Sequence, residues 1–210
     1  MVTGPRGYQV KNLSYRELWW EGAEKAPVDI FPWGSSAGDD YRPKTSACLA
    51  RDDTSLFAFM ETDETDLRML SRGFAHVHTD SCMELFISPD PGQSRYYLNF
   101  EFNPAGAMYL AIGTCRHDRT EIRMENYEEL LDVKAAVHDN GWNIKFRIPR
   151  SFLRRFFPGL ELNAGSKIRG NFYKCGDNTS RPHFGCWSPI NLPKPDFHCP
   201  DYFGILNLSG

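Results

Sequence analysis

The sequence is poor in patterns that identify a protein class directly. Its six cysteines form no Cys-x-x-Cys pair, so a zinc ribbon has no support. No apolar run approaches the roughly 18 residues that a membrane-spanning helix needs. The N-terminus lacks the charged and then apolar pattern of a signal peptide. We therefore expect no membrane partner and a cytoplasmic location, or an extracellular one if a signal peptide has been removed.

Clustered positive charge is also missing. The chain carries 24 Lys and Arg against 27 Asp and Glu, which gives a net charge of −3. Basic residues are dense only at 147–155, where their pattern is that of a short amphipathic helix. Domains that bind nucleic acid present a basic patch or stripe, so we expect no nucleic-acid partner.

The cysteines are placed as buried thiols. Cys48, Cys82 and Cys175 lie inside strand-like runs, where a cysteine usually behaves as a small apolar residue. This placement favours a reducing compartment.

Short runs rich in aromatic and β-branched residues recur along the chain, separated by turns. Residues 97–103 alternate between Tyr, Asn or Glu on one side and Leu or Phe on the other, as a strand does. Asn140-Gly141 predicts a hairpin turn, and only residues 149–157 predict a helix. Together these patterns predict an all-β fold, a two-sheet antiparallel β-sandwich of jelly-roll type with one short helix.

The order of these stretches resembles a known family. They are ACLARDDTSLFAFMETDE, DSCMELFISPD, YYLNFEFNPAG, GWNIKFRIP, RGNFYKCGD and PDYFGILNL. Across residues 26–208 the sequence resembles the family 9 carbohydrate-binding modules and their DOMON-like relatives. The resemblance implies a β-sandwich domain at 26–210, preceded by an N-terminal strand or extension at 1–25. It also implies a non-catalytic module that recognises a sugar in a cleft at one end of the sandwich.

In well-known members of that family, two tryptophans sandwich a sugar ring. Aligning on CMELF places one of these positions at His78, and aligning on YFGILNL places the other at Phe197. Two polar ligand contacts of the family fall on Glu101 and Lys174, in place of arginine and glutamine. The resemblance therefore implies a sugar cleft rebuilt for a different ligand.

Other candidates lie in loops rich in aromatic and polar residues, which are the groups that recognise sugars. Residues 174–198 form a long, Pro-rich stretch, and a loop of that length in a compact domain is usually functional. Trp33 either stands beside the cleft or forms a lid over the end of the sandwich, and Trp187 either contacts the ligand or packs its loop onto the sandwich. The predicted ligand-binding residues are His78, Phe197, Glu101, Lys174, Asp177, His198, His76, Trp33 and Trp187.

The cluster HVHTD at residues 76–80 leaves a second class of function open. Alternate residues of a strand share a face, so His76 and His78 could join Asp80 and either His183 or His198 in a zinc-type site. A small metal-dependent enzyme centred on these histidines, or a glycoside-processing protein, is therefore the alternative function. A third, suggested by the DOMON-like relatives, is haem binding through a Met or Lys ligand.

Two carboxyl groups bear on glycoside chemistry. Glu84 and Glu101 fall on strands that could be neighbours, and glycosidases use two carboxyl groups about 5 to 9.5 Å apart. Glu84 belongs to the sandwich motif, however, and we expect it to be structural. The sequence therefore favours a protein without enzyme activity.

The acidic loop at residues 61–66 offers the oxygen ligands that calcium prefers, without the spacing of an EF-hand. Asp63 and Asp66 are the candidate ligands of a structural calcium ion, and no other cofactor is expected. The expected partner is a carbohydrate. We also expect a catalytic domain or a neighbouring enzyme, because a binding module alone degrades no polysaccharide.

Overall fold

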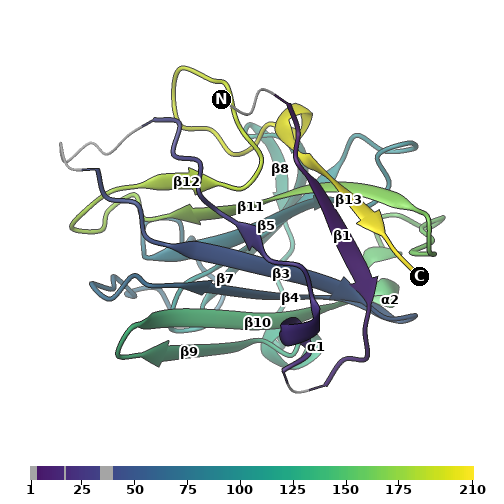
Figure 1. Cartoon of the computed structure of the whole chain (residues 1–210), viewed down its shortest axis with the longest axis horizontal. Coiled ribbons are helices and arrows are strands. Elements are labelled where there is room, and N and C mark those ends of the chain that lie inside the picture. Colours follow the sequence, from purple (N-terminus) through teal and green to yellow (C-terminus); the bar gives the residue numbers. More distant parts are fainter. Residues whose placement is uncertain (1–3, 17, 34–39) are drawn as a thin grey trace.

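The computed structural model describes residues 4–16, 18–33 and 40–210. Within them the chain forms thirteen strands, two α-helices of one turn each and two 3-10 turns. The strands make two packed layers, and in Figure 1 strands β3, β4 and β10 lie in front of the fainter strands of the second layer. The predictions of an all-β fold and of a β-sandwich are confirmed.

Sheet A holds strands from the middle and the end of the chain. Its strands lie in the order β8-β7-β6-β5-β11-β13, each antiparallel to its neighbours, and a short strand β12 pairs with β11. Their bounds are β5 (Cys82–Ser88), β6 (Tyr97–Phe102), β7 (Met108–Cys115), β8 (Asp118–Glu121), β11 (Lys167–Cys175), β12 (Phe184–Cys186) and β13 (Gly204–Leu208).

Sheet B holds strands from residues 26–62 and from residues 134–149. They lie in the order β3-β4-β10-β9, all antiparallel, and the two-residue strand β2 pairs with β3. Their bounds are β2 (Ala26–Pro27), β3 (Thr45–Arg51), β4 (Ser55–Thr62), β9 (Lys134–His138) and β10 (Gly141–Pro149).

Strand β1 (Gly7–Asn12) joins the two sheets and departs from the antiparallel prediction. Its first four residues pair with β13 and its last two with β3, and both pairings are parallel. Tyr8 and Val10 of this strand are fully buried in the common core. β1 lies within residues 1–25, for which the sequence predicts an N-terminal strand or extension, and it pairs with strands of residues 26–210.

The central strands β5 and β6 of sheet A are buried on both of their faces. Alternate side chains of β5 point in opposite directions, so Met83, Leu85 and Ile87 enter the core between the sheets. Cys82 and Phe86 belong instead to a second apolar cluster on the outer face of sheet A. Residues 176–203, called the covering segment below, contribute Ile190 and Phe197 to that cluster, among others. The outer face of sheet A is thus interior, and a side chain there sits under a second layer of chain.

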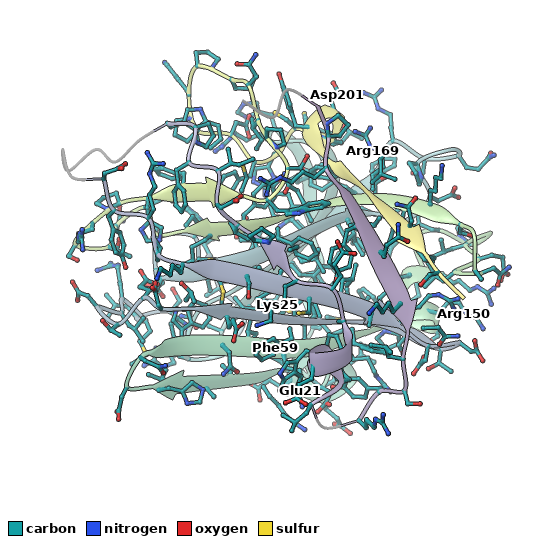
Figure 2. The ribbon with its side chains drawn as sticks, in the orientation of Figure 1. Glu21, Lys25, Phe59, Arg150, Arg169 and Asp201 are labelled. Carbon is teal, nitrogen blue, oxygen red and sulfur yellow. The ribbon has the colours of Figure 1, made fainter. Side chains whose placement is uncertain are left out.

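The helical elements are α1 (Tyr127–Leu130), α2 (Arg150–Leu153), η1 (Trp19–Gly22) and η2 (Pro200–Tyr202). The predicted helix at 149–157 is the single turn α2, and α1 was not predicted. The ring of Trp20 in η1 stacks on Phe59 of β4, with 4.3 Å between the ring centroids. Figure 2 shows Phe59 on the outer face of sheet B, near Glu21 of η1. Within the described residues, none of the helices has the length and apolarity that crossing a bilayer requires.

The hairpin predicted at Asn140-Gly141 is confirmed. It connects β9 to β10, whose register pairs Gly141 with His138. The φ angle of Gly141 is 138°, which disfavours residues with a side chain, and an added Cβ would lie 1.9 Å from the carbonyl oxygen of Thr62.

Candidate binding cleft

A cleft of about 190 Å³ opens on the outer face of sheet A. Strands β5, β6, β7 and β11 supply its floor with Glu84, Glu101, Tyr109 and Cys175. The walls come from the loop at residues 74–80, the β7–β8 hairpin and the covering segment. We expected a cleft at one end of the sandwich, but this one lies over the face of a sheet because the covering segment folds back across it.

Three hydrogen bonds hold these walls together. The backbone N–H of Asp177 donates to the carbonyl oxygen of His78 at 3.1 Å and joins the covering segment to the first loop. Arg116 Nε of the hairpin donates to Asp196 Oδ1, also at 3.1 Å. Tyr173 of the sheet donates its hydroxyl to the carbonyl oxygen of Phe197 at 3.1 Å. The walls of the cleft are therefore held together by hydrogen bonds of both the backbone and the side chains.

One wall of the cleft is aromatic. Phe197 lines it, is 7% exposed, and stacks on Tyr173 with ring centroids 4.1 Å apart and planes inclined by 10°. Trp33 packs against Phe197 at 5.9 Å and donates its indole N–H to the carbonyl oxygen of Leu192 at 2.8 Å. Trp33 does not itself line the cleft. In this structure it supports the aromatic wall and anchors the covering segment, and its ligand contact stays a prediction.

Three predicted histidines do line the cleft. His76 packs over the ring of Tyr109 at 4.5 Å. Burial lowers the pKa of His78. Burial also lowers the pKa of His198 to about 2, and its Nδ1 lies 2.9 Å from the hydroxyl of Tyr97. His198 is thus a neutral ring that Tyr97 holds in place.

The floor of the cleft carries two opposed carboxyl groups. Glu84 and Glu101 are direct register partners on β5 and β6, and they are each 3% exposed. Burial raises the pKa of Glu84 to about 7. Burial also raises the pKa of Glu101 well above its ordinary range, and the nearby charge of Glu84 adds to that effect. Glu84, which we expected to be only structural, is therefore a residue of the cleft.

The predicted ligand contact of Lys174 is wrong. Phe172 and Lys174 alternate with Tyr173 and Cys175, so Lys174 points to the inner face of sheet A. It is fully buried there, with its Nζ 2.9 Å from Glu64 Oε2 and 2.8 Å from His183 Nε2. Its role is to neutralise a buried carboxylate inside the sandwich.

Trp187 is also a core residue and not a ligand contact. It is 2% exposed and packs edge-to-face between Tyr8, at 6.2 Å, and Phe172, at 5.6 Å. Gly204 lies against its ring, so that a Cβ at that position would come within 2.3 Å of it. Of its two interpretations, the core one is correct.

A metal site built on the four histidines does not fit the structure. His183 lies on the inner side of sheet A, where burial lowers its pKa to about 3 and Lys174 bonds its Nε2. His76, His78 and His198 lie on the opposite side, along the cleft. Among the described residues, the only group of three or more possible metal ligands that lie close together is Cys82, Glu84 and Cys175.

The acidic loop is partly occupied by internal bonds. Asp63 Oδ1 accepts a hydrogen bond from the backbone N–H of Lys44 at 2.8 Å, and Asp66 Oδ2 accepts one from the hydroxyl of Ser180. Glu64, between them, turns inward to Lys174. Calcium binding by Asp63 and Asp66 stays a prediction.

Sequence reasoning missed much of the cleft lining. The missed residues are Tyr109, Arg116, Arg119, Cys175, Phe184, Pro195 and Asp196, together with Glu84 as a ligand-facing group. The signal for Glu84 is its alternation with the apolar residues of CMELFIS, which places it on the same face as Cys82 and Phe86. The hairpin arginines carry no such signal, because their position depends on how β8 returns along β7.

A β-sandwich with a cleft that combines an aromatic wall with a few polar groups has the form of a module that binds small molecules. The chain belongs to carbohydrate-binding family 9, whose sequence model matches residues 16–208. That family consists of non-catalytic binding modules. No curated protein matches the chain significantly.

Solved structures agree with this assignment. A provisionally assigned carbohydrate-binding protein from Bacteroides uniformis is 28% identical, with a TM-score of 0.82 over 98% of this chain and 100% of its own. A family 9 module from Caldicellulosiruptor kristjanssonii in complex with cellotriose is 13% identical, with a TM-score of 0.68 over 98% and 94%. The same organism's module in complex with glucose is 14% identical, with a TM-score of 0.65 over 98% and 96%. The last two show that the fold is shared.

Proposed function

We propose that this chain binds one sugar residue, either a monosaccharide or the end of an oligosaccharide, in the cleft on the outer face of sheet A. The observation that carries the proposal is the pairing of the Phe197 wall with the Glu84–Glu101 floor. An aromatic ring offers a flat apolar face to the C–H groups of a sugar, and carboxyl groups accept hydrogen bonds from its hydroxyls.

The size of the cleft supports a single residue. Pockets for drug-sized ligands hold about 300 to 1,000 Å³, whereas this cleft holds about 190 Å³. The structures from Caldicellulosiruptor kristjanssonii contain glucose and cellotriose, so both a monosaccharide and a short chain are reasonable first ligands. Because Glu101 stands where the family resemblance places an arginine, amino sugars should be tested beside neutral ones.

Titration calorimetry with the wild type and with Phe197→Ala tests the proposal. Stacking of the sugar on an aromatic ring supplies much of the net free energy of sugar binding. We therefore expect the variant to lose at least about tenfold in affinity, or ~1.4 kcal/mol. Trp20→Ala is the matched control, because it removes a stacked aromatic ring from the outer face of sheet B. Equal affinities for the wild type and Phe197→Ala, or an equal loss in both variants, would contradict the cleft assignment.

We also propose that the chain does not catalyse a reaction on the sugar it holds. Glu84 and Glu101 are directly opposed on neighbouring strands, and both keep protons more readily than ordinary carboxyl groups. Such a pair suits hydrogen bonding to hydroxyls. Incubation with oligosaccharides followed by chromatography should return them unchanged; products that disappear in Glu84→Gln would show that the pair is catalytic. A catalytic domain or neighbouring enzyme as partner, and a cytoplasmic location, stay predictions.

A further inference from the structure

Two thiols and a carboxyl group meet on the floor of the cleft. Cys82 and Cys175 are direct register partners on β5 and β11, and Glu84 lies two positions after Cys82 on the same face of β5. The three residues are 0%, 1% and 3% exposed, in that order. Glu84 Oε1 lies 3.0 Å from Cys175 Sγ and 3.8 Å from Cys82 Sγ, and the three possible ligand atoms all lie within 4.8 Å of one another.

We propose that Cys82, Cys175 and Glu84 form a site for a thiophilic divalent cation of the zinc class, with a fourth coordination position that faces the cleft. This site goes beyond sugar binding and does not depend on it. Two of its members, Glu84 and Cys175, line the cleft, so an ion held there would be reached from solvent through the cleft.

The spacing of the three groups suits a tetrahedral ion. Zinc binds thiolate sulfur at about 2.3 Å and carboxylate oxygen at about 2.0 to 2.2 Å, so neighbouring ligand atoms stand about 3.5 to 3.8 Å apart. The Cys82–Glu84 distance of 3.8 Å already has this value. The Cys175–Glu84 distance of 3.0 Å would lengthen when the thiol loses the proton it shares with the carboxyl group. Cys82 and Cys175 are register partners on β5 and β11, and Glu84 is paired with Tyr173 and Glu101, so the strands hold the backbone of all three residues in place.

The donor set selects the kind of ion. Thiolates favour zinc and other soft or borderline ions, whereas calcium and magnesium require oxygen ligands. Burial raises the pKa of the Cys82 thiol to about 12, and the hydrogen bond with Cys82 and burial raise the pKa of Cys175 well above its usual value. Zinc binds cysteine as the thiolate, so an ion would bind here by displacing the protons of the two thiols.

The surroundings can complete the coordination. Glu101 is the cross-strand partner of Glu84, and Asp177 and His78 line the same cleft. The fourth ligand would be one of these groups, a water molecule or an oxygen atom of a bound sugar. The charge of Arg119 acts on Glu84 and would offset the excess negative charge of two thiolates and a carboxylate around a dication.

Cobalt titration of the reduced, chelator-treated protein tests the site. We expect one Co²⁺ per chain, with the thiolate-to-cobalt charge-transfer absorption and the visible bands of a tetrahedral site, and with displacement by Zn²⁺. Binding should release protons, because both cysteines lose theirs when they bind an ion as thiolates. Cys82→Ser and Cys175→Ser should each lower the affinity for cobalt at least about tenfold. Cys48→Ser, which changes a buried thiol of sheet B, should leave it unaltered.

Glu84→Gln and thiol alkylation keep the test decisive if a cysteine variant does not fold. Zinc should protect Cys82 and Cys175 of the wild type from alkylation in slightly destabilising urea, as measured by mass spectrometry, and should not do so in Glu84→Gln. Three results would overturn the proposal: no stoichiometric ion on the reduced wild type, cobalt spectra without a thiolate band, or binding that survives both cysteine variants and is lost in His78→Ala. Sugar titrations in the presence of chelator report on the proposed function separately.

Discussion

The direction in which a side chain leaves its strand decides its role in this protein. Glu101 and Lys174 both stand at positions that the family resemblance connects with ligand contacts. Glu101 points to the cleft, whereas Lys174 points into the sandwich and reaches Glu64 and His183. One is therefore available to a ligand, and the other is part of the interior.

Lys174→Met should destabilise the fold without weakening sugar binding. The variant leaves the carboxylate of Glu64 buried without its ammonium partner, which costs about 3 to 5 kcal/mol in comparable buried pairs. Urea unfolding measures this loss, and calorimetry measures the sugar affinity of the folded fraction.

Lys25→Met is the matched control, since it removes a surface lysine whose ion pair has the same N–O distance as that of Lys174. Lys25 Nζ lies 2.9 Å from Glu61 Oε1, but both side chains are largely exposed, so the expected loss is below about 1 kcal/mol. A fall in sugar affinity with unchanged stability in Lys174→Met would restore Lys174 as a ligand contact.

At this scale the sequence predicted part of the site. His76, His78, Glu101, Asp177, Phe197 and His198 all line the cleft. Trp33 and Trp187 could not be placed from sequence, because an aromatic residue in a loop packs inward or outward according to what lies beneath it. Trp33 meets Phe197, and Trp187 meets Tyr8 of the first strand, which lies 179 positions earlier.

At the scale of elements, strong apolar runs predicted their strands well. The runs SLFAFMET, CMELFIS and KIRGNFYKC coincide with β4, β5 and β11. The strands β2, β8 and β12 were not predicted, because they have two to four residues and owe their form to the strands they pair with. The sequence DRTE of β8, for example, has no apolar residue.

The β9–β10 hairpin depends on the glycine that follows Asn140. Gly141→Ala should cost about 3 kcal/mol or more in urea unfolding, because the new Cβ would collide with the backbone of Thr62 at an unfavourable φ of 138°. Gly165→Ala is the control. Its φ of 87° is also positive, but an added Cβ meets nothing within 4 Å, so backbone strain alone should cost about 1 kcal/mol. Equal losses would show that the collision is relieved by a small shift.

At the scale of the whole molecule, β1 joins the two sheets into one cooperative unit. Val10 is fully buried in the core and pairs with Leu208 of β13, and the next residues of β1 pair with β3. Val10→Ala should therefore lower the unfolding free energy by about 2 kcal/mol. Gln9→Ala, an exposed truncation on the same strand, should change it by less than about 0.5 kcal/mol.

Both variants should unfold in a single transition. Far-ultraviolet circular dichroism and tryptophan fluorescence should coincide along the urea curve, because both sheets share the core that β1 closes. Separate transitions by the two probes would show that the two sheets unfold independently.

The parallel pairing of the first and last strands also determines how the molecule would respond to mechanical force. Four register pairs join β1 to β13, from Gly7 with Ile205 to Val10 with Leu208, and in Figure 1 the two ends of the chain leave this pair in opposite directions. Tension between the termini would therefore act along the strands and strain all of these hydrogen bonds together, in shear. A domain built in this way should stay folded under pulling forces that would open a terminal hairpin one bond at a time.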